Sequence, residues 1–212
     1  MAPGLTRDSI VDAAFGVLDE AGIDGLTVRA LAARLGVKAS ALYWHVDSKQ
    51  AVLDEMGTEV ARRIVSSVTS LPEDVTLADA LRAYASAMRA EYLRHRDGAR
   101  TFSGTRLTDP EVLRRQEVGL ARLTARGMEL QHIVDAFAIV TAFVVGFVIE
   151  EQERAQSGAE RYDLRARDEA VGPDHPLARA AGALQYRPAD ERFDEHLERI
   201  IPALVADAPA PS

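Results

Sequence analysis

Side chains suited to contact with a nucleic acid are concentrated between Thr27 and Lys49. Arg29 can donate two hydrogen bonds to O6 and N7 of guanine, the commonest specific contact between a side chain and a base. Tyr43 and His45 can donate to phosphate oxygens. Trp44 stands between them, and three consecutive bulky side chains cannot all be buried on one short helix. We therefore expect at least one of the three to be exposed; the alternative for Trp44 alone is burial against the first helix of the chain.

Two short helices around a tight turn are predicted to position these side chains. Thr27 can cap the first helix because its hydroxyl can accept a free amide of the opening turn. Leu31 and Leu35 give that helix one buried stripe, and Gly36 ends it because glycine tolerates the left-handed backbone of helix ends. A second helix is predicted over residues 38–45. The pattern is that of a helix-turn-helix, whose second helix lies in the DNA major groove; a plain helical hairpin is the alternative.

The rest of the chain also shows helical periodicity and no strand-like alternation of useful length, so we expect an all-α protein. Further helices are predicted over 6–21, from a cap at Asp47 or Ser48 to about residue 67, from a cap at Thr76, over 108–127, 130–156, 177–185 and 188–205. Residues 98–104 are expected to be irregular and 157–176 to form a mobile loop. The predicted organisation is a DNA-binding domain over 1–50, a second helical domain over 51–206, and a frayed tail over 207–212.

Composition excludes several functional classes. The chain has no cysteine, which excludes disulfides and cysteine-based zinc sites and suits a reducing cytoplasm. No apolar leader is expected at the N-terminus, and the apolar run over 136–149 is shorter than the roughly 20 residues of a membrane span. His132 and His175 are isolated, so no metal and no cofactor are expected. No nucleophile elbow, phosphate loop or triad-like spacing supports an enzyme.

The net charge of −8 is unusual for a DNA-binding protein, and residues 1–50 contribute only −1 of it, from five Lys or Arg and six Asp or Glu. The placement of charge matters more for phosphate contact than the total. Basic residues cluster around the helix-turn-helix, whereas most acidic residues of the segment belong to the helix before it. The charge therefore weakens the DNA-binding interpretation without excluding it.

The sequence LGVKASALYWHVDSK, residues 35–49, resembles the signature of the tetracycline-repressor (TetR) family. The preceding helix and GIDGLTVRALA match the rest of that module. HRDGARTFSGTR, residues 95–106, and GFVIEEQE, residues 146–153, resemble the ligand domain of the tetracycline-repressor subgroup. The resemblance implies a homodimeric, ligand-responsive repressor with two partners, a palindromic double-stranded DNA operator and a small-molecule effector. It also implies that residues 51–206 are the effector-binding and dimerisation domain.

The resemblance also assigns roles to individual DNA-binding positions. Phosphate contacts are implied for Thr27, Tyr43, His45 and Lys49. Arg29 is expected to read a base, and the start of the recognition helix is expected to meet base edges through Lys38, Ala39, Ser40 and Ala41. An alanine methyl can touch a thymine methyl, but such small side chains do not reveal the operator sequence. Trp44 completes the candidate DNA-binding set.

The family places its effector cavity among the helices that follow the DNA-binding head, and this implies a set of candidate ligand residues. The set is Val65, Tyr84, Met88, Phe102, Thr105, Arg106, Gly119, Ala142, Phe143, Gly146 and Glu150. Phe102 stands where tetracycline repressors carry a metal-binding histidine, and a phenyl ring cannot ligate a cation. Val65, Tyr84, Met88 and Ala142 also depart from the drug-binding residues, whereas Thr105, Arg106 and Glu150 are retained. The substitutions predict a flat or hydrophobic effector rather than tetracycline–magnesium.

Several alternatives remain open on the sequence alone. Glu150 is interpreted either as a buried carboxylate aimed at a ligand or at Arg106, or as the solvated end of a helix. The apolar helices over 130–156 and 188–205 are either core elements or, as the resemblance implies, the four-helix interface of a dimer. A constitutive or corepressor-dependent regulator is a second functional hypothesis. A small-molecule enzyme or carrier with a vestigial DNA-binding head is a third.

Overall fold

A computed structural model describes residues 5–158 and 160–206, and all regular structure within them is helical, as the all-α prediction requires. The tail over 207–212 lies outside the described residues. The helices are α1 (Arg7–Gly25), α2 (Val28–Leu35), α3 (Ala39–Leu42), α4 (Lys49–Thr69), α5 (Leu77–Leu93), α6 (Gly98–Phe102), α7 (Pro110–Thr124), α8 (Leu130–Gln156), α9 (Leu164–Val171), α10 (Pro176–Gln185) and α11 (Ala189–Ala206).

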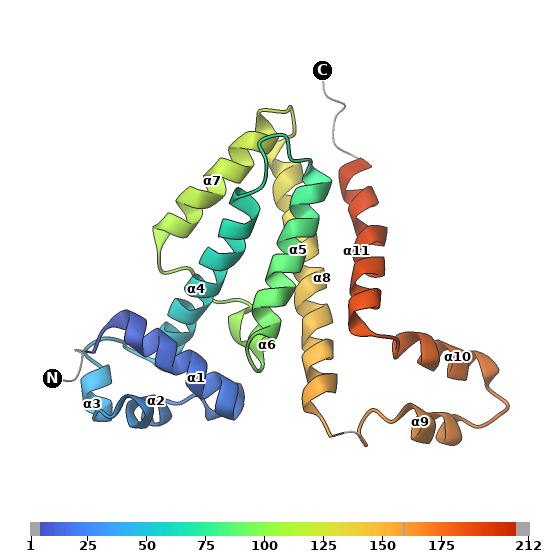
Figure 1. Ribbon diagram of the computed structural model, residues 1–212, viewed down its shortest axis with the longest axis horizontal. Helices are drawn as coiled ribbons and strands as arrows, with labels where there is room; N and C mark the ends of the chain where they lie inside the picture. The colour runs from blue at the N-terminus through green and yellow to red at the C-terminus, as the bar shows by residue number, and fades with distance from the viewer. Residues whose placement is uncertain (1–4, 159, 207–212) are drawn as a thin grey trace.

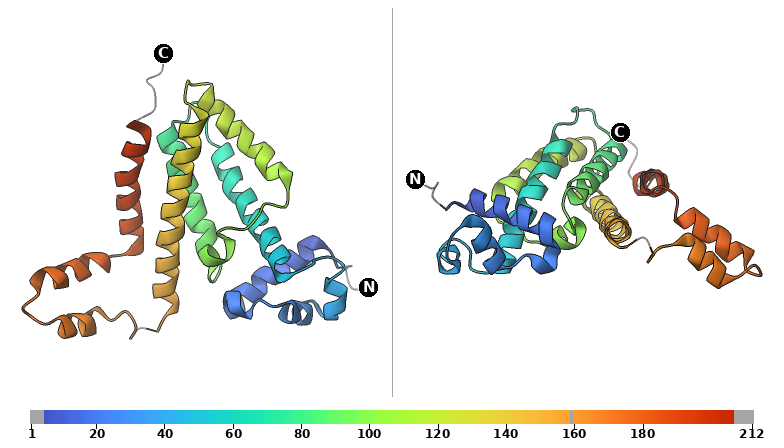
Figure 2. Two further views of the ribbon diagram at one scale, coloured as in Figure 1. Left: turned by 180° about the vertical axis from the view of Figure 1, so that it is seen from behind. Right: turned by 60° about the horizontal axis from the view of Figure 1, so that its bottom comes forward.

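The helices form a small head and a larger body (Figure 1). Helices α1–α3 make up the head, and α4 runs from the head into the body, where it packs against α5 and α7. The long helix α8 packs against α5, and α11 lies on the side of α5 and α8 that faces away from α4 and α7 (Figure 2). Helices α9 and α10 pack against each other as a projecting arm. Helix α4 is thus the element that joins the head to the centre of the body.

Local capping explains where the main helices begin. The Thr6 hydroxyl accepts the amide of Ser9 at 3.2 Å, and the Ser48 hydroxyl accepts that of Ala51 at 3.1 Å. Thr76 starts α5 in the same way, and Asp109 followed by proline starts α7. The end predicted for the first helix after residue 21 corresponds to a kink, because Gly22 has φ 70° inside the span Arg7–Gly25. These signals act within one turn of helix, so the sequence predicts them well.

Two predicted loops are wrong in part. Residues 98–102 form the short helix α6, although the segment shows no helical signal of its own. Its start is held by distant contacts: Asp97 adopts φ 55°, and its carboxylate accepts the amide of Ile23 in the head at 3.1 Å. Residues 164–171 form α9, capped by the Asp163 carboxylate, which accepts the amides of Arg165 and Ala166. The recognition helix is also shorter than predicted, because only residues 39–42 are helical before a turn.

Helix α8 is buried on one side only. It has 27 residues, and its most apolar 18-residue window has a mean hydropathy of 2.2 but is only 28% buried. By length and composition the helix could cross a membrane, so the expectation drawn from the 14-residue run was too restrictive. The buried side faces the body through Ala136, Val140, Val144 and Val148, whereas Val134 and Ile139 remain about half exposed. An apolar face of this kind marks an interaction surface.

Candidate functional site

The outer face of α2, α3 and the following turn carries most of the predicted DNA-binding side chains. The exposed members are Thr27, Arg29, Lys38, Ser40, Tyr43, Trp44 and His45. Ala39 and Ala41 are half-buried. Trp44 is 89% exposed and Tyr43 is 56% exposed, so the alternative that Trp44 packs against the first helix is wrong.

Short-range contacts fix the orientation of this face. The Thr27 hydroxyl accepts the amide of Ala30 at 3.1 Å, and Gly36 ends α2 with φ 67°. Leu31 and Leu42 are buried behind the two helices. After α3, the amides of His45 and Val46 both donate to the Leu42 carbonyl at 2.9 Å. Because Leu42 and Val46 point inward, the residues between them are turned toward solvent.

The cations of the head differ in what they contact. Arg34 forms an ion pair with Glu20 at 2.6 Å, so its charge is compensated within the head. Arg29 and Lys38 form no ion pair with any part of the chain that the structure describes. The ammonium group of Lys49 donates to the Ile23 carbonyl at 2.7 Å. This residue, for which a phosphate contact is predicted, therefore also links α4 to α1. Arg29 and Lys38 therefore present free positive charge on the face that carries Tyr43 and His45.

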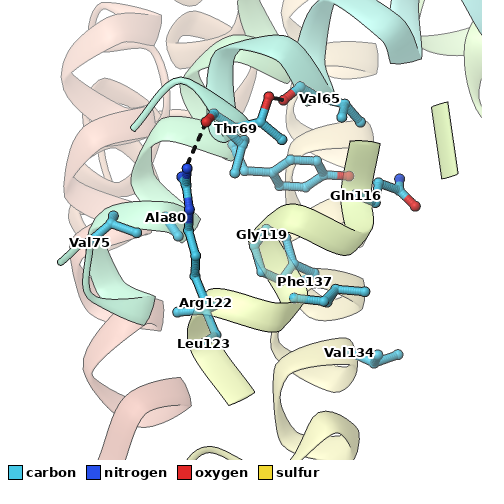
Figure 3. A pocket seen from close by; sticks show the side chains of 13 residues that line it. Val65, Thr69, Val75, Ala80, Gln116, Gly119, Arg122, Leu123, Val134 and Phe137 are labelled. Carbon is cyan, nitrogen blue, oxygen red and sulfur yellow. Dashed lines mark hydrogen bonds between the residues drawn. The ribbon is translucent and has the colours of Figure 1, made fainter. Parts of the chain in front are cut away.

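A second site is a cavity of about 240 Å³ in the body, between α4, α5, α7 and α8. Its lining is Val65, Val68, Thr69, Val75, Ala80, Tyr84, Gln116, Gly119, Leu120, Arg122, Leu123, Val134 and Phe137 (Figure 3). Three predicted ligand residues, Val65, Tyr84 and Gly119, are among them. Thr141 donates to the Phe137 carbonyl, so the Tyr84 hydroxyl donates to Thr141 at 2.9 Å. The cavity is apolar with a few polar groups at its edge, as small-molecule sites usually are.

The region around Phe102 is filled rather than open, contrary to the predicted cavity position. Phe102 is 4% exposed, and its ring lies 5.9 Å from that of Phe15, 6.0 Å from Tyr92 and 5.8 Å from His95, between centroids. Met88 is also buried, 2% exposed. Burial raises the pKa of the Tyr92 hydroxyl because the charged form would lose its hydration. Phe102 and Met88 are therefore core residues and do not line the cavity.

Thr105 and Arg106 lie in the connection between α6 and α7, away from the cavity lining. The Thr105 hydroxyl donates to the Phe102 carbonyl at 2.9 Å. The backbone amide of Arg106 donates to the carboxylate of Asp54 on α4 at 3.1 Å, and its side chain is exposed. Their observed contacts fasten this connection to α4.

The remaining predicted ligand residues on α8 face away from the cavity. The side chain of Glu150 is 70% exposed and lies 3.8 Å from Arg154, so the buried-carboxylate interpretation is wrong and the solvated helix end is correct. Ala142 and Gly146 are exposed. Phe143 stacks on Phe193 of α11 at 5.5 Å. These positions belong to the α8–α11 side of the body, because helical periodicity turns them away from the face that carries Phe137.

Most of the cavity lining was missed by sequence reasoning. The residues not predicted are Val68, Thr69, Val75, Ala80, Gln116, Leu120, Arg122, Leu123, Val134 and Phe137. One signal was available, because residues 116, 120 and 123 follow each other at helical spacing on one face of α7. Within residues 5–158 and 160–206, no group of three or more His, Cys, Asp or Glu could hold a metal ion.

Comparisons with known proteins agree with this architecture. A family model described as "Bacterial regulatory proteins, tetR family" matches residues 10–56, and one described as "Tetracyclin repressor-like, C-terminal domain" matches residues 69–206. The class D tetracycline repressor protein of Escherichia coli is 36% identical over 198 residues, covering 93% of this chain and 88% of that protein.

Two solved structures are similar over nearly the whole chain. The TetR-Q116A protein of Acinetobacter baumannii AYE in complex with minocycline has a TM-score of 0.75 at 28% identity, covering 98% of this chain and 100% of that one. The TetR family protein ActR of Streptomyces coelicolor in complex with actinorhodin has a TM-score of 0.79 at 27% identity, covering 98% of both chains. The likeness therefore includes the body as well as the head.

Proposed function

This chain belongs to the tetracycline-repressor-like family of bacterial regulatory proteins, and from that membership we propose that it represses transcription from a palindromic operator in the cytoplasm. The chain is thus a DNA-binding regulator of the ligand-responsive type. In the proposal, residues 1–50 form the DNA-binding domain and residues 51–206 bind the effector and a second copy. A small hydrophobic or aromatic effector binds more tightly to the conformation that releases DNA than to the conformation that binds it.

The exposed face of α2, α3 and the following turn is the observation that carries the DNA-binding part. Trp44 at 89% exposure and Tyr43 at 56% would be costly surface groups for a head with no partner. Tyr43 and His45 are free to donate to phosphates, and Lys38 opens the helix that would enter the major groove. Arg29 has no ion pair within the described chain and is available for a guanine edge.

The uncovered face of α8 supports a homodimer. Val134, Ala138, Ile139 and Ala142 are exposed along it, and an apolar helix face of this length is stabilised when a second copy covers it. A two-fold dimer would place two recognition helices about one turn of DNA, roughly 34–36 Å, apart. Operator symmetry would then follow from the symmetry of the protein.

The cavity supports an effector other than tetracycline–magnesium. Phe102 is packed into the core where a metal-binding side chain would be needed, and no metal-ligating cluster occurs within the residues described by the structure. Helix α4 lines the cavity through Val65, Val68 and Thr69 and starts beside the head at Lys49. A ligand that displaces the far end of α4 would move the head. The population of the DNA-binding state would then fall to an extent set by how much more tightly the ligand binds the released state than the DNA-binding state.

The direct test is DNA binding by the purified protein to the intergenic region beside its own gene, titrated with salt. We expect a footprinted palindrome and a steep salt dependence from released counterions. Arg29→Ala should lose operator selectivity and keep the dimer, whereas Arg114→Ala, a 72% exposed arginine on α7, should retain selectivity. Unchanged selectivity in Arg29→Ala would remove this residue from base reading. Weak binding to every sequence would favour a corepressor-dependent regulator, and ligand binding without DNA affinity would favour a carrier.

A further inference from the structure

Two arginines, Arg122 of α7 and Arg126 in the turn that follows it, fasten the connection between α4 and α5. Nη1 of Arg122 donates to the carbonyls of Thr69 at 3.2 Å and Leu71 at 3.0 Å (Figure 3 shows the first). Nη1 of Arg126 donates to the carbonyls of Asp74 at 2.6 Å and Val75 at 2.9 Å. The last carbonyls of a helix have no partner within the helix. The C-terminal end of α4 therefore depends on Arg122 for its anchoring.

Arg122 differs from Arg126 in its surroundings. It is half-buried and, among the residues that the structure describes, is the only charged one that lines the cavity, whereas Arg126 is exposed and does not line it. A guanidinium carries five N–H donors, of which those on Nη1 are used by the two carbonyls. For Nε and Nη2 no hydrogen-bond partner occurs within 5–158 and 160–206, and over the same ranges no carboxylate pairs with Arg122. Nε and Nη2 are not among the buried unpaired atoms of the described residues, so this edge of the guanidinium is accessible to an anion.

We propose that the effector of this cavity is an organic acid, with a carboxylate that pairs with Arg122 and an apolar or aromatic body that lies against Tyr84, Leu120 and Phe137. This inference rests on the proposed ligand-responsive function and names the chemical class of its ligand. The free Nε and Nη2 edge of a guanidinium matches both oxygens of a carboxylate. A cationic ligand would meet the like charge of Arg122, because no acidic side chain lines the cavity.

The same contact supplies a route to the DNA-binding head. A carboxylate bound at the Nε and Nη2 edge attracts the whole guanidinium toward the cavity, away from the carbonyls of Thr69 and Leu71 that Nη1 contacts. When the guanidinium turns toward the acid, the last turn of α4 loses its anchor. Helix α4 carries the head at its other end, so the acid-bound state is the one in which α4 can shift. Arg122 is therefore a specificity-determining residue and a positioning residue for α4.

The test uses 2-naphthoate and 2-naphthamide, which share an aromatic body and differ in charge, titrated calorimetrically into the full-length protein. We expect the wild type to bind the naphthoate with an affinity about 10-fold to 100-fold higher than the naphthamide, the range that one hydrogen-bonded interaction with a charged group contributes. Arg122→Met should abolish the preference. Arg126→Met, which removes the neighbouring carbonyl anchor outside the cavity, should keep it. Hydrogen exchange at the amides of Ser70 and Leu71 should accelerate in the naphthoate complex of the wild type.

Equal affinity for the two probes, failure of the naphthoate to bind, or a preference that survives in Arg122→Met would overturn the proposal. A purely structural role for Arg122 predicts equal loss of stability in both methionine variants with no change of selectivity. Operator binding without a probe is measured on the same preparation. Operator binding without acid preference refutes this inference alone, and acid preference without operator binding refutes the proposed function alone.

Discussion

Replacement of Gln152 by leucine should destabilise the body more than any other change of similar size on α8. Gln152 is 6% exposed, and its amide makes three hydrogen bonds to the backbone where α5 ends and α6 begins. Its Oε1 accepts the amide of Ala99 at 3.1 Å, and its Nε2 donates to the carbonyls of Tyr92 at 3.0 Å and His95 at 2.8 Å. Leucine fills a similar volume and removes these bonds: the Ala99 amide and the Tyr92 carbonyl lose the Gln152 partner, whereas the His95 carbonyl still accepts the amide of Gly98 at 3.0 Å.

The size of the effect follows from these three bonds. Each net hydrogen bond contributes about 1 kcal/mol, and a buried group left without a partner costs more, so the loss should be about 3 to 5 kcal/mol. Urea unfolding followed by circular dichroism at one protein concentration measures this free energy. Gln156→Leu is the control, because Gln156 is exposed at the end of the same helix and should change stability by less than about 0.5 kcal/mol.

The same loop holds the head, so the variant has a second readout. The backbone amide of Arg96 donates to Asp19 at 3.2 Å, and the carboxylate of Asp97 accepts the amide of Ile23 at 3.1 Å. Loosening the loop should therefore weaken operator binding as well as stability. A loss of stability below about 1 kcal/mol would refute the reasoning, because it would mean that water or other groups satisfy the loop without Gln152.

Three further predictions concern other elements. Gly146→Arg should disrupt the proposed homodimer in sedimentation, because no atom of the described residues lies within 4 Å of an added Cβ and the proposed second copy would be met there; Gly158→Arg, equally open, should leave the proposed dimer intact. Gly98→Ala should lower the thermal midpoint, since its Cβ would strike the backbone carbonyl of Tyr92; an unchanged midpoint would show that the loop yields freely. The pKa of Asp109 lies below its ordinary value of 3.8, through hydrogen bonds from the Glu111 amide and then Arg62. The stability that ionised Asp109 gives to the folded protein is thus fully present above pH 3.8 and is lost as the pH falls through the lower pKa of the folded state. Asp109→Asn should therefore flatten the decline of the thermal midpoint toward about pH 3. An unaltered decline would contradict this.

The head and the helix starts were predictable because their causes are local. Thr27, Ser48, Thr76 and Asp109 each cap a helix within one turn, and Gly36 ends one through its own backbone. The exposure of Tyr43 and His45 follows from the inward direction of Leu42, four residues before Val46. Helix α8 was predicted with its observed bounds, Leu130–Gln156, because its apolar residues are continuous.

The cavity and its ligand residues were not predictable in the same way, because they depend on which side chains of four helices meet. Phe102, Met88 and Glu150 carry the residue types of a ligand site, but packing buries the first two and turns the third to solvent. The tertiary structure alone places the Arg122 guanidinium beside the end of α4 and at the edge of an apolar cavity. The sequence by itself thus determined the helix-turn-helix and the all-α class through contacts within a few residues. Only the packing of α4, α5, α7 and α8 decided where the cavity lies, because that depends on contacts between residues far apart in the chain.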